Sequence, residues 1–184
     1  MTSAVAALLE ACSDEVFERV GPVIGLGLQH EEQHQELLLM DIKHVLGTNP
    51  LRPAYREELR SRVSRTTPLK WHAFAGGEVS IGHEGDDFAF DNEQPRHTTH
   101  VRPFELASRP VTAGEFLEFM EDGGYGRSEL WLADGWDCVQ RESWRAPLYW
   151  QASEAGWQVM TLDGLCELDP TEPVCHVSYY EAEA

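Results

Sequence analysis

The chain has little positive charge. Of its 184 residues, 14 are lysine or arginine and 32 are aspartate or glutamate, so the formal net charge at pH 7 is −18. A surface of this sign repels phosphate groups, which argues against electrostatic binding to nucleic acid or to an anionic membrane. The imbalance is uneven, because residues 1–67 carry 10 acidic and 7 basic side chains whereas residues 68–184 carry 22 and 7. This asymmetry indicates two differently built parts.

Cysteine and long apolar runs are also scarce. No C-x-x-C pair and no dense cysteine framework is present, which is typical of free thiols in a reducing cytosol, although a disulfide between two of the last three is an alternative. No apolar run approaches the roughly 20 residues that span a bilayer, and the first 20 residues show no signal-peptide pattern. We therefore expect a cytoplasmic protein. The cysteines are Cys12, Cys138, Cys166 and Cys175.

Apolar residues at helical spacing dominate the first 50 positions. One helix is expected over residues 3–19 with Ser3 as its N-cap, and Gly21-Pro22 should end it and start a second helix at Pro22. The second helix should reach Leu46, with Gly47 as the residue that follows its cap. At 1.5 Å per residue it would be about 36 Å long, the length of a helix in a bundle.

Short β-like segments begin at Trp71. They cover residues 71–74, 78–81 and 100–106 and are separated by glycine- and aspartate-rich turns. Residues 48–69, which contain three prolines and several arginines, are expected to be a linker between the helical and the β-rich parts.

Two later helices and one irregular region are also expected. Thr112 and Glu115 form the capping-box pattern of a helix over residues 112–122, and Ser178 with Glu181 repeats it near the end of the chain. Residues 125–170 are rich in tryptophan with weak periodicity, which predicts loops held by large aromatic side chains. The chain as a whole is predicted to be α+β.

The most informative stretch is His30-Glu31-Glu32-Gln33-His34. Residues four apart share one helix face, so both imidazoles can reach a single divalent metal ion. The neighbouring carboxylates and amides are able to orient the imidazoles. The alternative is a solvated or partly buried polar patch. His44 lies about 21 Å farther along the helix, too far to share the metal. The other histidines are expected to be structural: His72, His83, His97, His100 and His176.

The same five residues satisfy H-E-x-x-H, the pattern of zinc metalloproteases in which glutamate is the general base. The longer form of that pattern fails, because Leu37 and Met40 stand where glycine and histidine would be needed. A downstream carboxylate ligand would have to be Glu57 or Glu58, in a proline-flanked, arginine-rich stretch. The protease is therefore the disfavoured alternative.

A longer match lies around this motif. The string HEEQHQELLLMDIKHVLGTNPLRPAY resembles the metal-binding helix of the ergothioneine-biosynthesis sulfoxide synthases of the EgtB type. In order, FAGGEVSIGHEG, FAFDNEQPRHTTHV, FELASRPVTAGEFLEFMEDGGY, LWLADGW, APLYW and PVCHVSYYEAEA resemble successive blocks of that family's C-terminal domain. Each block alone is a weak signal, but the ordered series covers nearly all of residues 20–184.

The resemblance implies a fold and a set of site residues. Residues 1–50 would be the C-terminal helices of a DinB-like four-helix bundle, residues 51–69 a linker, and residues 70–184 an incomplete formylglycine-generating-enzyme-like (sulfatase-modifying factor, C-type-lectin-like) domain. Family members hold Fe(II) with three histidines, of which His30 and His34 match two, so the third is expected upstream of this chain. Gln33 matches a position that faces the imidazole substrate, and the catalytic tyrosine is expected beyond residue 184.

The resemblance also implies a reaction. The family uses O2 to join the sulfur of γ-glutamylcysteine or cysteine to the imidazole of hercynine as a sulfoxide. As a truncated piece, the chain is expected to be inactive alone. The alternatives are a non-catalytic binding or scaffold module and a homologue that transfers selenium or another sulfur group. The sequence does not determine the oligomeric state.

Overall fold

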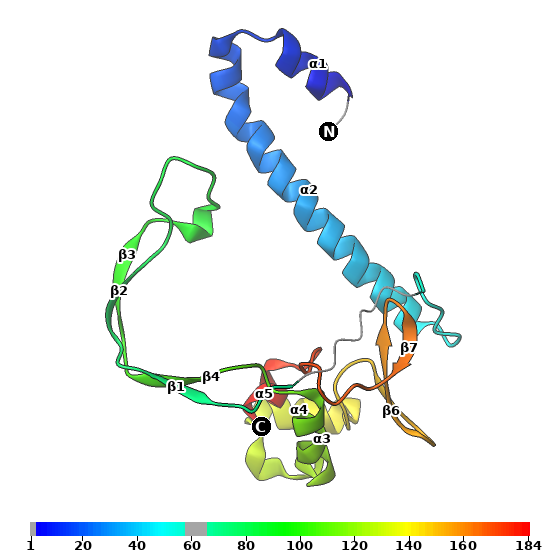
Figure 1. Cartoon of the computed structure of the whole chain (residues 1–184). Helices are drawn as coiled ribbons and strands as arrows, with labels where there is room; N and C mark the ends of the chain where they lie inside the picture. Colours follow the sequence, from blue (N-terminus) through cyan, green and yellow to red (C-terminus); the bar gives the residue numbers. More distant parts are fainter. Residues whose placement is uncertain (1–2, 58–65) are drawn as a thin grey trace. The chain divides into compact units, whose positions relative to one another are not determined.

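The computed structural model describes residues 3–57 and 66–184, which form two compact units (Figure 1). One unit comprises residues 1–41 and 74–104, and the other comprises residues 42–73 and 105–184. Helices and sheets are both present, as predicted. The elements are, in order, α1 (Ser3–Ala11), α2 (Asp14–Thr48), β1 (Trp71–Phe74), β2 (Gly77–Ile81), η1 (Asp91–Glu93), β3 (His97–Val101), β4 (Phe104–Ala107), α3 (Ala113–Glu121), η2 (Gly124–Gly126), η3 (Ser128–Leu130), α4 (Ala133–Glu142), β5 (Trp150–Ser153), β6 (Gly156–Thr161), β7 (Gly164–Glu167) and α5 (Tyr179–Glu183).

The first helix is shorter than predicted, and the second begins earlier. Helix α1 ends at Ala11, because Ser13 starts a new helix: its hydroxyl accepts from the backbone N–H of Val16 at 3.4 Å and its carbonyl accepts from Phe17 at 2.8 Å. That arrangement is typical of an N-cap. The predicted cap by the Ser3 side chain lies outside what the structure describes.

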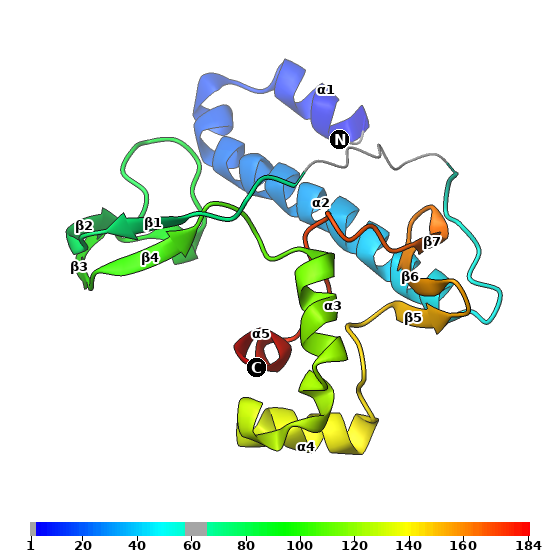
Figure 2. The ribbon, with the colours of Figure 1, turned by 60° about the horizontal axis from the view of Figure 1, so that its bottom comes forward.

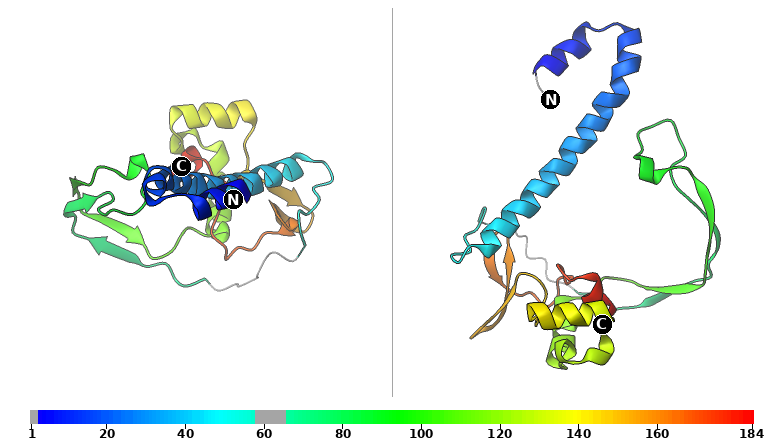
Figure 3. Two further views of the ribbon diagram at one scale, coloured as in Figure 1. Left: turned by 90° about the horizontal axis from the view of Figure 1, so that it is seen from above. Right: turned by 180° about the vertical axis from the view of Figure 1, so that it is seen from behind.

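The predicted break at Gly21-Pro22 was wrong. Helix α2 is 35 residues long and continues through Pro22 without a break, and Figure 3 shows it as one long rod. Proline removes one backbone donor and crowds the preceding turn, at a cost of about 3 kcal/mol. A helix of this length keeps its hydrogen bonds on both sides of that position, so one missing donor does not end it.

Gly47 does not cap α2 as predicted. The helix ends one residue later, at Thr48, and Gly47 lies against β6. A Cβ atom on Gly47 would lie 3.3 Å from Met160 Cγ and 3.3 Å from carbons of the Tyr149 ring. Met160 is only 1% exposed. Glycine therefore favours the close approach of the helix to the sheet, since a larger residue would crowd these side chains.

Two short antiparallel pairs follow the linker region. Strands β2 and β3 pair from Gly77↔Val101 to Ile81↔His97, and β1 pairs with β4. The single strand expected over residues 100–106 is interrupted between β3 and β4. Proline cannot donate a ladder hydrogen bond, and Pro103 lies at that interruption.

The region expected to be irregular, residues 125–170, is largely regular. It contains α4 and the antiparallel sheet β5–β6–β7, whose hairpins close at Ser153↔Gly156 and Thr161↔Gly164 (Figure 2). The prediction was wrong because Asp134 and Gly135 lower the helix propensity of α4. The apolar spacing of Leu132, Trp136 and Val139 was the overlooked helical signal.

The capping boxes at α3 and α5 are confirmed. Thr112 Oγ1 accepts from the Glu115 backbone N–H at 3.2 Å, and the Thr112 N–H donates to the Glu115 carboxylate at 2.9 Å. Ser178 and Glu181 repeat the pattern, with distances of 3.2 and 2.6 Å. Both helices therefore begin where the sequence predicts.

Among the described residues, the buried apolar side chains belong to the second unit. They come from α3, α4, β6 and the loop before α4, whereas α2 has no buried residue. The core of the chain is thus built by residues 105–184. These buried side chains are Ala113, Phe116, Trp131, Val139 and Met160.

Candidate metal centre

His30 and His34 lie next to each other on α2, as predicted. Their ring centroids are 4.3 Å apart and the ring planes are inclined by 51°. One helical turn separates the two side chains, so a single cation can be approached by a nitrogen from each ring. Both residues are exposed. The donor set therefore fits two ligands of a metal ion that favours imidazole, such as iron or zinc.

A third protein ligand is not present in residues 3–57 and 66–184. No group of three histidine, cysteine, aspartate or glutamate side chains there could hold a metal ion. Glu57, one of the two glutamates that a metalloprotease would need, joins no such group, and Glu58 lies outside the described residues. The expectation of a third, upstream histidine stays a prediction.

Gln33 is exposed on the same helix, three residues after His30. Side chains three apart are neighbours on a helix surface, so Gln33 is a surface neighbour of His30. An amide at this place offers both hydrogen-bond donors and an acceptor to a ligand held by the histidines. Its assignment to substrate binding stays a prediction.

Several of the other histidines make local contacts. His44 Nδ1 lies 3.0 Å from the Tyr149 hydroxyl, His83 Nε2 lies 3.1 Å from an Asp87 carboxylate oxygen, and His97 Nδ1 lies 3.0 Å from a backbone carbonyl. His97 and His100 both belong to β3, where a spacing of three places them on opposite faces. The structure therefore does not bring this pair together.

The histidine-containing stretch of α2 continues into an exposed apolar face. Four consecutive residues that follow the histidines are 43–63% exposed, and further apolar side chains of α2 are exposed before and after them. Surface helices normally bury such a stripe against neighbours. The four residues are Leu37, Leu38, Leu39 and Met40.

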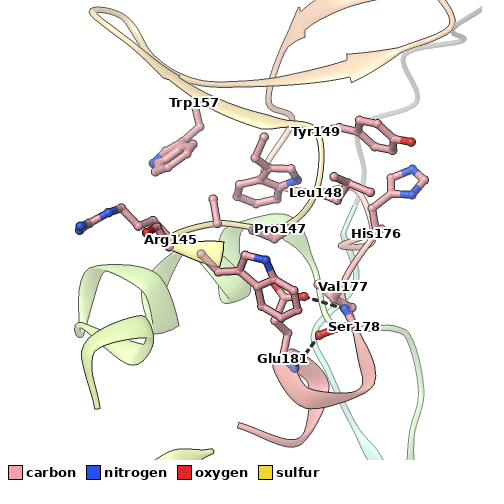
Figure 4. A pocket seen from close by; sticks show the side chains of 13 residues that line it. Arg145, Pro147, Leu148, Tyr149, Trp157, His176, Val177, Ser178 and Glu181 are labelled. Atoms are coloured by element: carbon pink, nitrogen blue, oxygen red, sulfur yellow. Dashed lines mark hydrogen bonds between the residues drawn. The ribbon is translucent and has the colours of Figure 1, made fainter. Parts of the chain in front are cut away.

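The second unit contains a cavity of about 660 Å³ (Figure 4). Its walls include Trp144, Trp150 and Trp157, and Arg145 lies at its edge. Glu181, which also lines it, is 6% exposed and accepts a hydrogen bond from the Tyr125 hydroxyl. Burial and then this hydrogen bond raise the pKa of Tyr125 above its ordinary value. The sequence had suggested only a capping role for Glu181.

The chain has four cysteines. All four are free thiols, as the sparse spacing predicted. No helix among the described residues has both the length and the apolar character needed to cross a membrane.

The mixed helix-and-sheet architecture defines an α+β protein, and one of its helices carries two adjacent imidazoles. Residues 58–184 match the sulfatase-modifying factor enzyme 1-like domain, and the chain belongs to that family. The formylglycine-generating-enzyme-like domain expected from the sequence blocks is thereby confirmed.

Relatives extend the match to the rest of the chain. The hercynine oxygenase of Mycobacterium tuberculosis is 37% identical over 182 residues, which are 98% of this chain and 40% of that protein. The hercynine oxygenase of Mycolicibacterium thermoresistibile is 31% identical over 165 residues, 87% of this chain and 35% of that protein. Ergothioneine biosynthesis protein 1 of Neurospora crassa is 28% identical over 113 residues, covering 55% of this chain and 13% of that protein. The resemblance to ergothioneine-biosynthesis enzymes is confirmed, and the chain spans 35–40% of the length of these two hercynine oxygenases.

Proposed function

We propose that the chain is part of a non-heme iron(II)-dependent, O2-using sulfoxide synthase of ergothioneine biosynthesis. The enzyme would join the sulfur of γ-glutamylcysteine or cysteine to the imidazole of hercynine. One observation carries the proposal: adjacent imidazoles on one face of α2, in a chain that matches hercynine oxygenases over nearly its whole length. A role in the cytoplasm with small-molecule substrates follows from this assignment.

His30 and His34 would be two of the iron ligands. Neutral imidazole binds iron well, and two protein ligands leave positions open for others. When bound, Fe(II) would supply the redox chemistry with O2 that forming a sulfoxide requires. The proposal needs a third protein ligand that the described residues do not provide.

Gln33 would orient hercynine at this metal. Gln33 is exposed and is a helix-surface neighbour of His30, and its amide can donate to or accept from the nitrogen atoms of a substrate imidazole. A fixed imidazole orientation would present one ring carbon to the incoming sulfur. A proton donor or acceptor for the reaction, expected to be a tyrosine, would come from outside residues 3–57 and 66–184.

The proposed architecture divides the chain into residues 1–50 from a DinB-like helical bundle, a linker over residues 51–69, and the enzyme domain from residue 70. The exposed apolar stripe of α2 supports the bundle, because such a stripe requires neighbouring helices to bury it. Part of the linker is hydrogen-bonded to the enzyme domain. The N–H groups of Tyr55 and Arg56 both donate to the Leu162 carbonyl, at 2.9 and 3.2 Å.

A second candidate is a non-catalytic binding or scaffold module. The lack of a third ligand among the described residues favours it for this chain by itself. Anaerobic titration with Fe(II) separates the two candidates. The 184-residue chain is expected to bind iron weakly and without a defined stoichiometry, whereas a hercynine oxygenase of full length is expected to bind one equivalent.

Replacing His34 tests the ligand assignment. In a full-length hercynine oxygenase, the alanine variant at the position equivalent to His34 should lose both bound iron and turnover, since one imidazole ligand is removed. Iron content is measured by metal analysis, and turnover by sulfoxide formation. Alanine at the position equivalent to His72, far from α2 in sequence, is the control. Retained iron and turnover in the first variant would exclude the assignment. Comparing thiol and selenium donors in the same assay identifies the substrate class.

A further inference from the structure

Four side chains of the second unit meet where the end of α2 lies against the segments that contain Tyr149 and His176. Lys43 Nζ is 2.5 Å from His176 Nε2 and 4.8 Å from the centroid of the Tyr149 ring. His44 Nδ1 is 3.0 Å from the Tyr149 hydroxyl. The Tyr149 and His176 rings make an edge-to-face contact with centroids 4.9 Å apart, and Figure 4 shows the two side by side.

Tyr149 and His176, the two residues that contact the end of α2 here, have unusual backbone conformations. The φ angles of Tyr149 and His176 are +73° and +62°, in the left-handed region that bulky residues seldom adopt. Hydrogen bonds fix both: the Met160 N–H donates to the Tyr149 carbonyl at 2.9 Å, and the Leu148 N–H donates to the His176 carbonyl at 3.2 Å. Residues persist in such conformations only where their surroundings compel it, and they are concentrated at clamps and functional sites.

Burial and the neighbouring charges together determine the protonation of His176. Lys43 faces it from α2, Tyr149 faces it from the segment before β5, and Asp169 and Glu172 line the same cavity of about 180 Å³ with Lys43. Burial, and then the charge of Lys43, lower the pKa of His176 below its ordinary value of 6.5. An ammonium group can only donate, so Nε2 of the neutral ring must accept from Lys43.

We propose that Tyr149 and His176 form a clamp that holds Lys43 and His44 at the end of α2, and that protonation of His176 opens it. Once protonated, Nε2 carries its own hydrogen and cannot accept from Lys43, and two positive charges then face each other at hydrogen-bond distance. The inference does not depend on the proposed reaction, because it concerns only how residues 42–48 are held against residues 105–184 within the second unit.

The sign of the pH dependence follows from the depressed pKa. The folded clamp binds fewer protons than the unfolded chain near pH 6.5. Its contribution to stability is therefore fully present above that pH. The contribution is lost as the pH falls through the lower pKa of His176 in the folded state. Acidification from pH 7 to pH 5 should therefore loosen the end of α2.

Histidine NMR titration of the 184-residue chain tests the clamp directly. His176 should titrate below 6.5, and Lys43→Met should raise its pKa toward that value because a neighbouring positive charge is removed. Lys70→Met is the matched control and should leave the pKa of His176 unchanged. A His176 pKa equal to that of exposed His72, in wild type and in Lys43→Met alike, would overturn the proposal.

Hydrogen exchange tests whether protonation loosens the end of α2. Protection factors of the amides of residues 45–48, corrected for intrinsic exchange, should fall several-fold between pH 7 and pH 5 in wild type. His176→Asn tolerates the left-handed backbone and cannot titrate, so its protection should not vary with pH. Tyr149→Phe removes the hydroxyl bound by His44 and should lower protection at both pH values. Equal protection of wild type at pH 7 and pH 5 would exclude the clamp.

Discussion

The first 28 residues of α2, in the first unit, and residues 105–184, in the second unit, bury their apolar side chains very differently. The unit has a core in which Phe116, Trp131, Val139 and Met160 are at most 8% exposed, whereas α2 has no buried residue and shows an apolar stripe on its surface. The domain thus supplies its own packing, and the helix that carries His30 and His34 does not. In this chain the proposed metal ligands lie on the element that depends most on neighbours.

Truncating one side chain in each region is the strongest test of this comparison. Trp131→Ala should lower the free energy of unfolding by about 3–5 kcal/mol, because it leaves a cavity and removes the hydrogen bond from Nε1 to the Gly124 carbonyl. Leu38→Ala, at a side chain that is 60% exposed, should change it by less than about 0.5 kcal/mol. Urea unfolding followed by circular dichroism measures both.

The same substitution at Leu38 sharpens the comparison in a longer protein. In a full-length hercynine oxygenase, alanine at the equivalent position should cost about 2–5 kcal/mol if neighbouring helices bury the stripe. A negligible cost there would contradict the proposed bundle.

An acid-dependent contribution is expected in the domain. Hydrogen bonds from Arg109, and then from the Thr112 backbone, lower the pKa of Glu115 to about 2. Its contribution to stability is therefore present above pH 4.5 and is lost as the pH falls toward 2. Glu115→Gln should flatten the fall in unfolding free energy over that range, measured by urea titration at several pH values. Glu118→Gln, at an exposed position of the same helix, is the control. A slope unaltered by Glu115→Gln would show that the ion pair contributes nothing.

The smallest expected effects compare two glycines of α2. Nothing lies within 4 Å of a Cβ atom added to Gly25, so Gly25→Ala should stabilise the helix by about 0.5–1 kcal/mol. At Gly47 the same atom meets Met160 and Tyr149 at 3.3 Å, and that crowding should cancel or reverse the gain. Thermal unfolding of both variants measures the difference. Equal stabilisation by the two substitutions would show that α2 is not held closely against the sheet.

Local signals predicted much of the fold. The capping boxes of α3 and α5 each require only residues three apart, so Thr112 with Glu115 and Ser178 with Glu181 were recognised directly. The β1 segment and the proximity of His30 and His34 likewise depend on short-range geometry. Errors occurred where two local tendencies compete, as at Pro22, where a helix breaker lies inside a long helical pattern.

Other features required contacts between residues far apart in sequence. Helix α4 has weak propensity, and it is held by packing: a Cβ on Gly135 would lie 2.7 Å from Tyr180 of α5. Each two-residue turn of the β5–β7 sheet is followed directly by a glycine with positive φ, Gly156 or Gly164, a signal that was present but was obscured by the tryptophans around it. Helix and strand propensities alone could not predict the structure of these segments.

The sequence by itself determined the spacing of His30, Gln33 and His34, the starts of α3 and α5, and the family resemblance, because each depends on residues close together in the chain or on their order. Only the tertiary structure decided that Gly47 serves close packing and that Tyr149 and His176 meet Lys43 and His44. Those contacts join residues more than 100 positions apart, and no local pattern specifies which distant side chains will meet when the chain folds.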